Sequence, residues 1–246
     1  MKILLGLGGV VGLVAAMLVF GFPNRAPAAS HVENALAQPV LVELFTSQGC
    51  SSCPPADRLL ARLDGEDGVV AVSRPVTYWD RLGWKDTLAR SGNDRLQRDY
   101  AARGIPGSGV YTPEAVVQGA AAAVGSDESA LRDLIAGSRK DKAIALAQQG
   151  AEVVASRARA NVELRFLAIA SHSMVDIAKG ENRGRRIGYT NVVLAEQLAP
   201  CDPSLACRAP IPAGIAGRKG ADRWAAILQD RDGGTVRAVR WIRPAA

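Results

Sequence analysis

Two cysteines separated by two residues, Cys50 and Cys53, are the side chains of this chain that are best placed to do chemistry. Thiols at this spacing can form a disulfide that opens and closes in place. Pro54 and Pro55 follow directly, and two prolines fit only the first turn of a helix. Because the N-terminus of a helix favours negative charge, we expect Cys50 to react as a thiolate. We also expect Cys50, which precedes the helix, to be exposed and Cys53 to be more shielded.

The residues around the cysteines predict the elements that position them. An apolar, β-branched run over residues 40–45 predicts a buried strand, and the polar residues 46–49 predict a turn. The helix after Cys53 has its apolar residues at helical spacing, at Ala56, Leu59, Leu60 and Leu63. A Cys-x-x-Cys between a strand and a helix is the thioredoxin-like redox signature. A structural disulfide and half of a metal site are the alternatives, although the chain contains only two histidines, His31 and His172.

Several motifs of this chain resemble one family of secreted proteins. The most specific is Glu43-Leu-Phe-Thr-Ser-Gln-Gly-Cys-Ser-Ser-Cys-Pro-Pro-Ala-Asp57. Others follow in order: Tyr78-Trp-Asp-Arg-Leu-Gly-Trp-Lys-Asp86, Tyr111-Thr-Pro113 with Val116-Val117, and Gly180-Glu-Asn-Arg-Gly-Arg185 with Tyr189 and Asn191-Val-Val193. Together they resemble the thioredoxin-like family catalogued as domain of unknown function 1223, from about Pro39 to the C-terminus. The resemblance implies a fold and an export route but no substrate.

The resemblance to the thioredoxin superfamily implies roles for three further residues. In that superfamily a proline before the third strand has a cis peptide bond and packs against the disulfide, and Thr112-Pro113 matches that position. Its implied role is to leave a backbone edge free for a substrate peptide, and an ordinary Thr-Pro turn is the alternative. Glu43 resembles the acid beneath the disulfide that relays protons to the second thiol, with one more residue before Cys50. A solvent-facing or salt-bridged glutamate is the alternative.

The order of elements predicts an α/β fold with a thioredoxin-like domain over residues 39–140. Residues 69–72 predict a second strand parallel to the first, residues 94–103 a helix, residues 115–117 and 121–124 a hairpin, and Ser126 the cap of another helix. From residue 141 to 246 short alternating apolar runs predict a smaller β-rich, sandwich-like domain. Only residues 191–198 carry a pattern that also suits a helix.

Three aromatic residues lie close together in the loop over residues 77–86. Tyr78, Trp79 and Trp84 are large, amphipathic rings that could line a substrate groove. The same rings could instead cap an edge of the core, so both interpretations stay open. In the family pattern a histidine and an aspartate precede this motif, whereas Pro75 and Thr77 stand there in this chain.

A second cysteine pair, Cys201 and Cys207, lies in a proline-containing loop of the C-terminal half. A disulfide closing so short a loop stabilises a fold by about 2–3 kcal/mol on the chain-entropy model. We therefore predict a structural disulfide, with a second redox pair that relays electrons to Cys50 as the alternative.

Composition and the N-terminus bear on the compartment. The chain has 246 residues, of which 48% are hydrophobic, so it is globular and long enough for one large or two small domains. Its net charge of +6 comes without a long basic run or a nucleic-acid motif. Residues 1–28 predict a signal peptide with cleavage after Ala28, or after Ala37 at a second position. An uncleaved membrane anchor is the alternative. Four cysteines suit an oxidising compartment, so we expect a periplasmic or secreted protein.

Thiol–disulfide exchange on protein partners is the function that these residues favour. Cys50 would attack and Cys53 would resolve the mixed disulfide, without a cofactor or a metal. A Cu(I) carrier is the alternative from another class, since soft thiolates suit Cu(I); beyond the thiols, this chain offers it only His31, His172 and Met174. A scaffold with a purely structural disulfide is a third. The direction of exchange, the partner and the oligomeric state cannot be read from the sequence.

Overall fold

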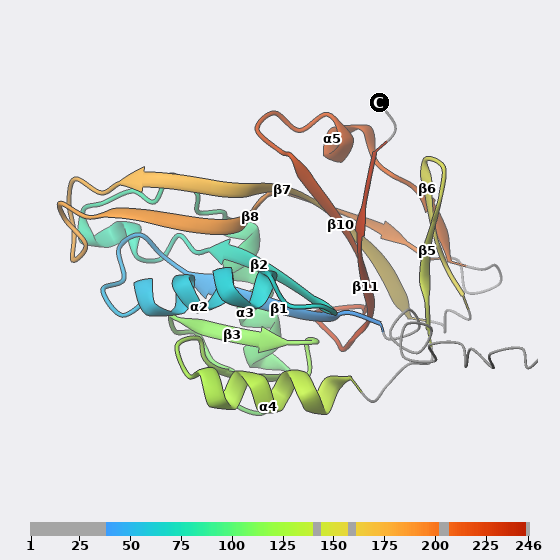
Figure 1. The fold of residues 1–246 in the computed structure, drawn as a ribbon, viewed down its shortest axis with the longest axis horizontal. Coiled ribbons are helices and arrows are strands. Elements are labelled where there is room, and N and C mark those ends of the chain that lie inside the picture. The colour runs from blue at the N-terminus through green and yellow to red at the C-terminus, as the bar shows by residue number, and fades with distance from the viewer. Residues whose placement is uncertain (1–37, 140–143, 157–160, 202–206, 245–246) are drawn as a thin grey trace, which may run out of the picture. The chain divides into compact units, whose positions relative to one another are not determined.

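The computed structural model describes residues 38–139, 144–156, 161–201 and 207–244 (Figure 1). The leader predicted at residues 1–28 or 1–37 lies outside this range, as do residues 202–206 within the second cysteine loop. Among the described residues, no helix has both the length and the apolar character needed to cross a membrane.

The first three elements form the predicted strand–helix–strand unit. Strand β1 spans Val40–Thr46, helix α2 spans Pro54–Asp64 and strand β2 spans Val69–Pro75. The two strands pair in parallel, from Val40 opposite Val69 onward, and both are buried throughout. Burial on both faces explains why they read as continuous apolar runs rather than alternating ones.

The next elements complete a thioredoxin-like order. They are the short helix η1 (Asp80–Leu82), helix α3 (Ser91–Ala102), strands β3 (Glu114–Val117) and β4 (Ala121–Val124), and helix α4 (Glu128–Ser138). Strand β3 pairs antiparallel with β1 and with β4. The cap of α4 differs from the prediction, because the Asp127 carboxylate rather than Ser126 accepts the Ala130 N–H, at 3.0 Å.

The remaining elements are mostly strands, as predicted. They are β5 (Leu146–Gln149), β6 (Glu152–Ala155), β7 (Val162–Asp176), β8 (Arg186–Pro200), β9 (Arg208–Pro210), α5 (Ala213–Ala216), β10 (Arg223–Asp230) and β11 (Val236–Ile242). The possible helix over residues 191–198 is wrong, since this segment belongs to β8. Its backbone hydrogen bonds go to β7 along a long antiparallel ladder, which overrides a weak helical pattern.

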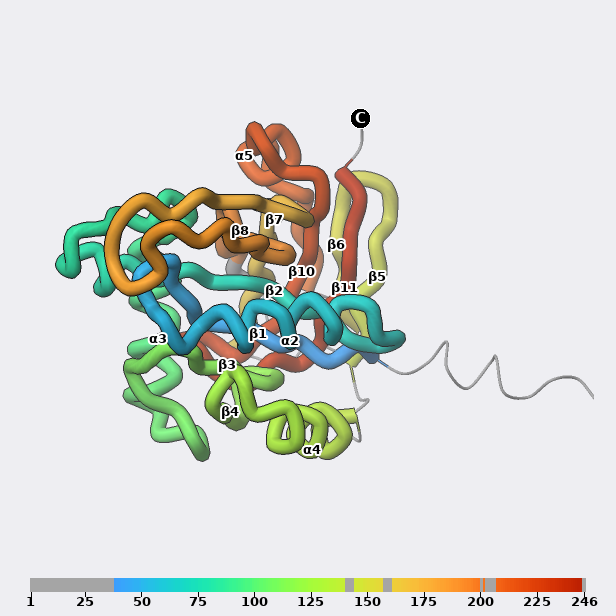
Figure 2. The backbone as a smooth tube through the Cα atoms, turned by 60° about the vertical axis from the view of Figure 1, so that its left-hand side comes forward, coloured from blue at the N-terminus to red at the C-terminus, as the bar shows by residue number. Residues whose placement is uncertain are grey.

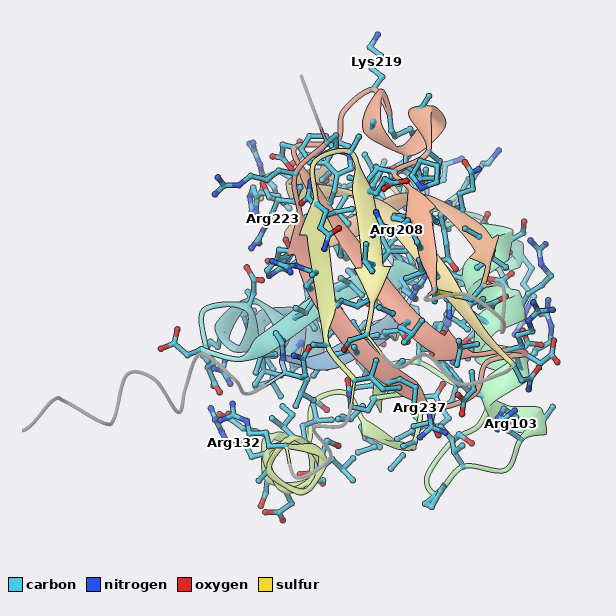
Figure 3. All side chains as sticks on the ribbon, turned by 90° about the vertical axis from the view of Figure 1, so that its right-hand side faces the viewer. Arg103, Arg132, Arg208, Lys219, Arg223 and Arg237 are labelled. Carbon is cyan, nitrogen blue, oxygen red and sulfur yellow. A yellow bond between two sulfur atoms is a disulfide. The ribbon has the colours of Figure 1, made fainter. Side chains whose placement is uncertain are left out.

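The strands form two sheets. The larger has the order β11-β10-β7-β8-β2-β1-β3-β4, and the smaller has the order β5-β6-β9. Figure 3 shows the β5–β6 hairpin in front of β10 and β11, and a shared core that includes Val153, Phe166 and Ala226 lies between the two sheets. The predicted α/β class with a sandwich-like C-terminal half is therefore confirmed. The boundary near residue 140 stays a prediction, and strands from both sides of it hydrogen-bond in the larger sheet.

The two faces of β1 carry different cores. Val42 and Leu44 pack in the cluster that contains Leu59 of α2. Phe45, on the other face, packs in the cluster that contains Tyr100 of α3. Because side chains alternate along a strand, residues of odd and even number on β1 face different helices. This alternation decides which polar residues can reach the helix that follows the cysteines.

Candidate functional site

The Cys50–Cys53 disulfide joins the end of β1 to the start of α2. The two sulfurs are bonded with a Cα–Cα distance of 5.4 Å and a χ3 angle of 88°. Cys53 is the N-cap residue of α2, and Pro54 and Pro55 occupy its first turn as the sequence predicted. The Cys53 N–H donates to the Cys50 carbonyl at 3.2 Å, and the Asp57 N–H donates to the Cys53 carbonyl at 3.1 Å. The turn therefore holds the pair at the positive end of the helix dipole.

The expected exposure of Cys50 is wrong, because both cysteines are fully buried. The cover comes from the loop between β7 and β8, more than 120 residues further along the chain. Asn182 donates from its amide to the carbonyls of Gln48, at 3.0 Å, and Cys50, at 2.8 Å. The Glu181 carboxylate accepts the Ser51 N–H at 2.9 Å. Figure 2 shows this loop beside the segment that follows β1.

The predicted aromatic residues connect the disulfide turn to its neighbours. The Trp79 indole N–H donates to the Thr112 hydroxyl at 2.8 Å, and the Trp84 indole N–H donates to the Gln48 side-chain carbonyl at 2.9 Å. Tyr78 and Trp79 also pack against the core around Phe45. Trp84 thus contacts the turn before Cys50 through Gln48, whereas Tyr78 and Trp79 cap a core edge. Their role in binding a substrate stays a prediction.

Thr112 and Pro113 directly precede β3. The peptide bond between them is cis. Pro113 accepts a backbone hydrogen bond from Gly125 at 2.9 Å. A side chain at Gly125 would meet Leu44, Ala56 and Pro113 within 3.2 Å, so Pro113 packs close to the first turn of α2 only because residue 125 is glycine.

Glu43 lies on the face of β1 opposite α2, which differs from the role predicted for it. Its carboxylate accepts from the Arg74 guanidinium and from the Tyr100 hydroxyl, both at 2.5 Å, in a fully buried cluster. Arg74 also binds Glu196, which pairs in turn with Arg165. Glu43 is therefore a salt-bridged residue, the alternative that the sequence left open, and the geometry does not bring it to the cysteines.

The acid that does lie near the cysteines is Asp57, which the sequence reasoning missed. It sits one turn after Cys53 on the buried face of α2 and is only 3% exposed. Residues four apart on a helix share a face. Within the described ranges neither carboxylate oxygen of Asp57 has a hydrogen-bond partner. Burial raises the pKa of Asp57 to about 7; the nearby Thr46 side chain lowers it in part, and the Asp86 charge adds to the rise. Its signal in the sequence was an aspartate at a position where helical spacing calls for an apolar residue.

Asp57 belongs to a set of buried polar groups between α2 and the sheet. The hydroxyls of Thr46, Ser73 and Tyr189 are buried and, in the part of the chain that the structure describes, have no hydrogen-bond partner. Burial, together with the charges of Asp57 and Asp86, raises the pKa of Tyr189. Buried polar atoms without partners are rare in folded proteins, so each such group calls for an explanation. In this protein these unpartnered groups lie on the same side of the sheet as Asp57, whose pKa of about 7 lets it titrate near neutral pH.

The second predicted disulfide is also formed. Cys201 and Cys207 are bonded and largely buried, in the core between the two sheets. A cluster of three or more histidine, cysteine or carboxylate side chains able to hold a metal ion is not found among the described residues.

Comparison with known proteins identifies a family and similar folds. A family described as "Protein of unknown function (DUF1223)" matches residues 41–229. A probable thioredoxin of Archaeoglobus fulgidus is 32% identical over 76 residues, which cover 28% of this chain and 79% of that protein. A crystal structure of an Agrobacterium tumefaciens protein aligns with a TM-score of 0.68 and 28% identity, over 85% of this chain and 96% of the other. HBP35 of Porphyromonas gingivalis aligns with a TM-score of 0.55 over 85% of this chain and 78% of the other. At 12% identity it shows likeness of fold alone.

Proposed function

The chain belongs to the DUF1223 family, and we propose that this member is a thiol–disulfide exchange protein that acts on protein partners through Cys50 and Cys53. The observation that supports the proposal most directly is the placement of Asp57. A disulfide that serves only to stabilise the fold does not require a buried acid one helical turn away. An exchange site does, because one of its thiols must lose a proton during each cycle.

The proposed reaction has two steps. In the reduced protein the Cys50 thiolate attacks one sulfur of a partner disulfide, forms a mixed disulfide and releases the partner's other sulfur as a thiolate. The Cys53 thiol then gives its proton to the Asp57 carboxylate and attacks the Cys50 sulfur. This second attack re-forms Cys50–Cys53 and releases the partner's remaining thiolate, so two electrons have passed to the partner. The reverse sequence oxidises a partner dithiol.

The raised pKa of Asp57 suits this task. A carboxyl group with a pKa of about 7 is partly deprotonated at neutral pH, so it can both accept and return a proton there. Burial also strengthens the interaction of its charge with a nearby thiol. Glu43 is instead bound to Arg74 and Tyr100 on the face of β1 opposite α2, so it does not lie beside the second thiol.

The proposal extends to the compartment. Its support is the apolar leader followed by Ala26-Pro27-Ala28, together with an even number of cysteines that form two disulfides. Mass spectrometry of protein from the cell envelope is expected to find an N-terminus near Ala29 or Gln38. An intact Met1 on membrane-bound protein would contradict cleavage of the leader.

The decisive test of the exchange function is a trapping experiment. Cys53→Ala keeps the attacking thiol and removes the resolving one, so mixed disulfides with partners should accumulate and appear on a non-reducing gel. Cys50→Ala is the matched control and should trap almost nothing. Asp57→Asn should leave the first attack near the wild-type rate, slow resolution and remove the rise of the resolution rate with pH near 7. Equal trapping by both cysteine variants, or none by either, would refute the exchange function and leave a metal-binding or structural pair.

A further inference from the structure

A pocket of about 370 Å³ lies beside the redox disulfide, where the first turns of α2 meet the start of β8. Its lining residues are Pro54, Arg58, Arg185, Arg186, Ile187 and Gly188. Pro54 follows Cys53 directly, so the pocket borders the cysteine turn. Half of the lining residues are arginines, and arginines gathered around a concave surface produce a positive potential that attracts anions.

The positive charge of this pocket is not neutralised within the described part of the chain. Arg58 is exposed and forms no ion pair with a carboxylate of the described residues, although the charge of the buried Asp57 acts on it. Arg185 donates to the side-chain carbonyl of Asn182, which is neutral. Arg186 approaches Asp176 only to 3.8 Å, and both side chains are mostly exposed, so that pair contributes little. The three guanidinium groups therefore remain available to an outside anion.

A second, independent observation shows that the cysteine turn accommodates a carboxylate. Ser51, between the two cysteines, donates its backbone N–H to the carboxylate of Glu181 at 2.9 Å. The Ser51 side chain and, to a smaller extent, this backbone N–H lower the pKa of Glu181, so the turn favours the ionised form of the carboxyl group. Glu181 is exposed and belongs to the loop that covers Cys50. The contact can thus be exchanged for an equivalent contact from another molecule.

We propose that the arginine pocket binds an acidic segment of the redox partner, located a few residues from the partner's reactive cysteine. This inference rests on the proposed exchange function and defines its substrate class. Guanidinium groups bind carboxylates through paired, charge-assisted hydrogen bonds, so aspartate or glutamate side chains suit Arg58 and Arg186. A partner carboxylate that replaces Glu181 on the Ser51 N–H would also release the loop that covers Cys50. Binding of the partner's acidic segment and exposure of Cys50 would then occur together.

The test uses three synthetic peptides, each with one cysteine activated as a 2-pyridyl disulfide and flanked by glutamate, glutamine or lysine. Reduced protein attacks the peptide sulfur through Cys50 and releases 2-thiopyridone, whose absorbance gives the rate of the first step. Cys53 then attacks the Cys50 sulfur, re-forms the disulfide and releases the peptide thiol. Rates are measured at one pH, at low and at high salt, for the wild type, Arg58→Gln, Arg186→Gln and Lys219→Gln. Lys219 is exposed beyond α5 (Figure 3) and does not line the pocket, and its replacement removes the same charge.

At low salt the glutamate peptide should react at least about tenfold faster than the lysine peptide, with the glutamine peptide between them. The difference should shrink at high salt. Arg58→Gln and Arg186→Gln should slow the glutamate peptide and leave the glutamine peptide unchanged, whereas Lys219→Gln should change neither. Equal rates for the three peptides at low salt, or equal effects of the arginine and lysine variants, would overturn this inference alone. No thiopyridone release from any peptide would overturn the exchange function, and this inference with it.

Discussion

Asn182 donates a hydrogen bond from its side-chain amide to the backbone carbonyl of Cys50 at 2.8 Å, across 132 positions of sequence. The same amide donates to the Gln48 carbonyl, so one buried side chain holds both ends of the turn that leads into the disulfide. The Arg185 guanidinium donates to the side-chain carbonyl of Asn182 and so holds the other end of that side chain. The β7–β8 loop is thereby fixed onto the Cys50–Cys53 disulfide, and access to Cys50 depends on contacts that this loop makes.

The first prediction is that Asn182→Ala exposes the disulfide. Two buried carbonyls lose their donor, which should lower the free energy of unfolding by about 1–3 kcal/mol. The rate at which a small phosphine reduces Cys50–Cys53 should rise several-fold, because the loop no longer covers the sulfurs. Alkylation and mass spectrometry after short exposures to the phosphine measure this rate. Lys179→Ala, an exposed change in the same loop, is the control and should react like the wild type. An unchanged rate in Asn182→Ala would mean that this contact does not limit access.

The second prediction concerns the dependence of stability on pH. The pKa of Asp57 is raised from 3.8 to about 7 in the folded protein, so between these values the folded state binds more protons than the unfolded state. The contribution of Asp57 to the free energy of unfolding is therefore unfavourable above the folded pKa and absent below the unfolded one. Stability should fall as the pH rises from about 4 to about 7, by at most about 4 kcal/mol. Asp57→Asn cannot titrate and should lack this fall.

Urea unfolding of the oxidised protein at several pH values measures this effect. Asp57→Asn should match the wild type near pH 4 and become the more stable of the two above about pH 7. Asp67→Asn, a change in the exposed turn before β2, serves as the control and should follow the wild-type curve. Parallel curves for Asp57→Asn and the wild type would show that Asp57 does not carry a raised pKa.

The local parts of the fold were predictable because their signals lie within short stretches of sequence. The double proline after Cys53 marks the start of α2, and the apolar runs of β1 and β2 mark buried strands. The cover over Cys50 was not predictable, since it depends on pairing between segments more than 120 residues apart. The sequence of the Gly180–Arg185 motif does not indicate which part of the chain the motif contacts.

Glu43 shows how one residue of register changes a functional assignment. Counted along the chain, it resembles a buried acid next to a redox pair, but it stands one position further from Cys50. Since side chains alternate along a strand, one position moves a side chain to the opposite face of the sheet. Glu43 therefore meets Arg74 and Tyr100, while Asp57 of α2 lies on the side of the cysteines.

The third prediction follows from this buried cluster. Glu43→Gln removes the charge that pairs with Arg74. Removing one partner of a buried ion pair lowers the free energy of unfolding by about 3–5 kcal/mol, because the other charge stays buried without a partner. We expect a large loss in the free energy of unfolding and, in the folded variant, an exchange rate close to that of the wild type. Glu128→Gln breaks exposed pairs with Arg62 and Arg132 and should leave the free energy of unfolding nearly unchanged. If Glu43→Gln instead stays stable and slows resolution, Glu43 rather than Asp57 serves the second thiol.

The fourth prediction tests the packing around the disulfide turn with two glycines. A Cβ atom at Gly125 would lie 2.6 Å from a methyl group of Leu44 and 3.2 Å from the Cβ atoms of Ala56 and Pro113. Gly125→Ala should therefore push Pro113 away from the start of α2 and lower the free energy of unfolding by about 1–3 kcal/mol. Because the displaced atoms lie next to the cysteine turn, its exchange rate should fall as well.

Gly137→Ala is the matched control for Gly125→Ala. Gly137 lies within α4, and nothing stands within 4 Å of the position that its Cβ would occupy. Alanine in the interior of a helix is more favourable than glycine by about 0.5–1 kcal/mol, so this variant should be more stable than the wild type with unchanged exchange. Thermal unfolding and the peptide exchange assay measure both variants. If the Gly125→Ala protein is as stable and as active as the wild type, Pro113 can move away from α2 without loss. The close packing of Pro113 against α2 would then not be needed for stability or for exchange.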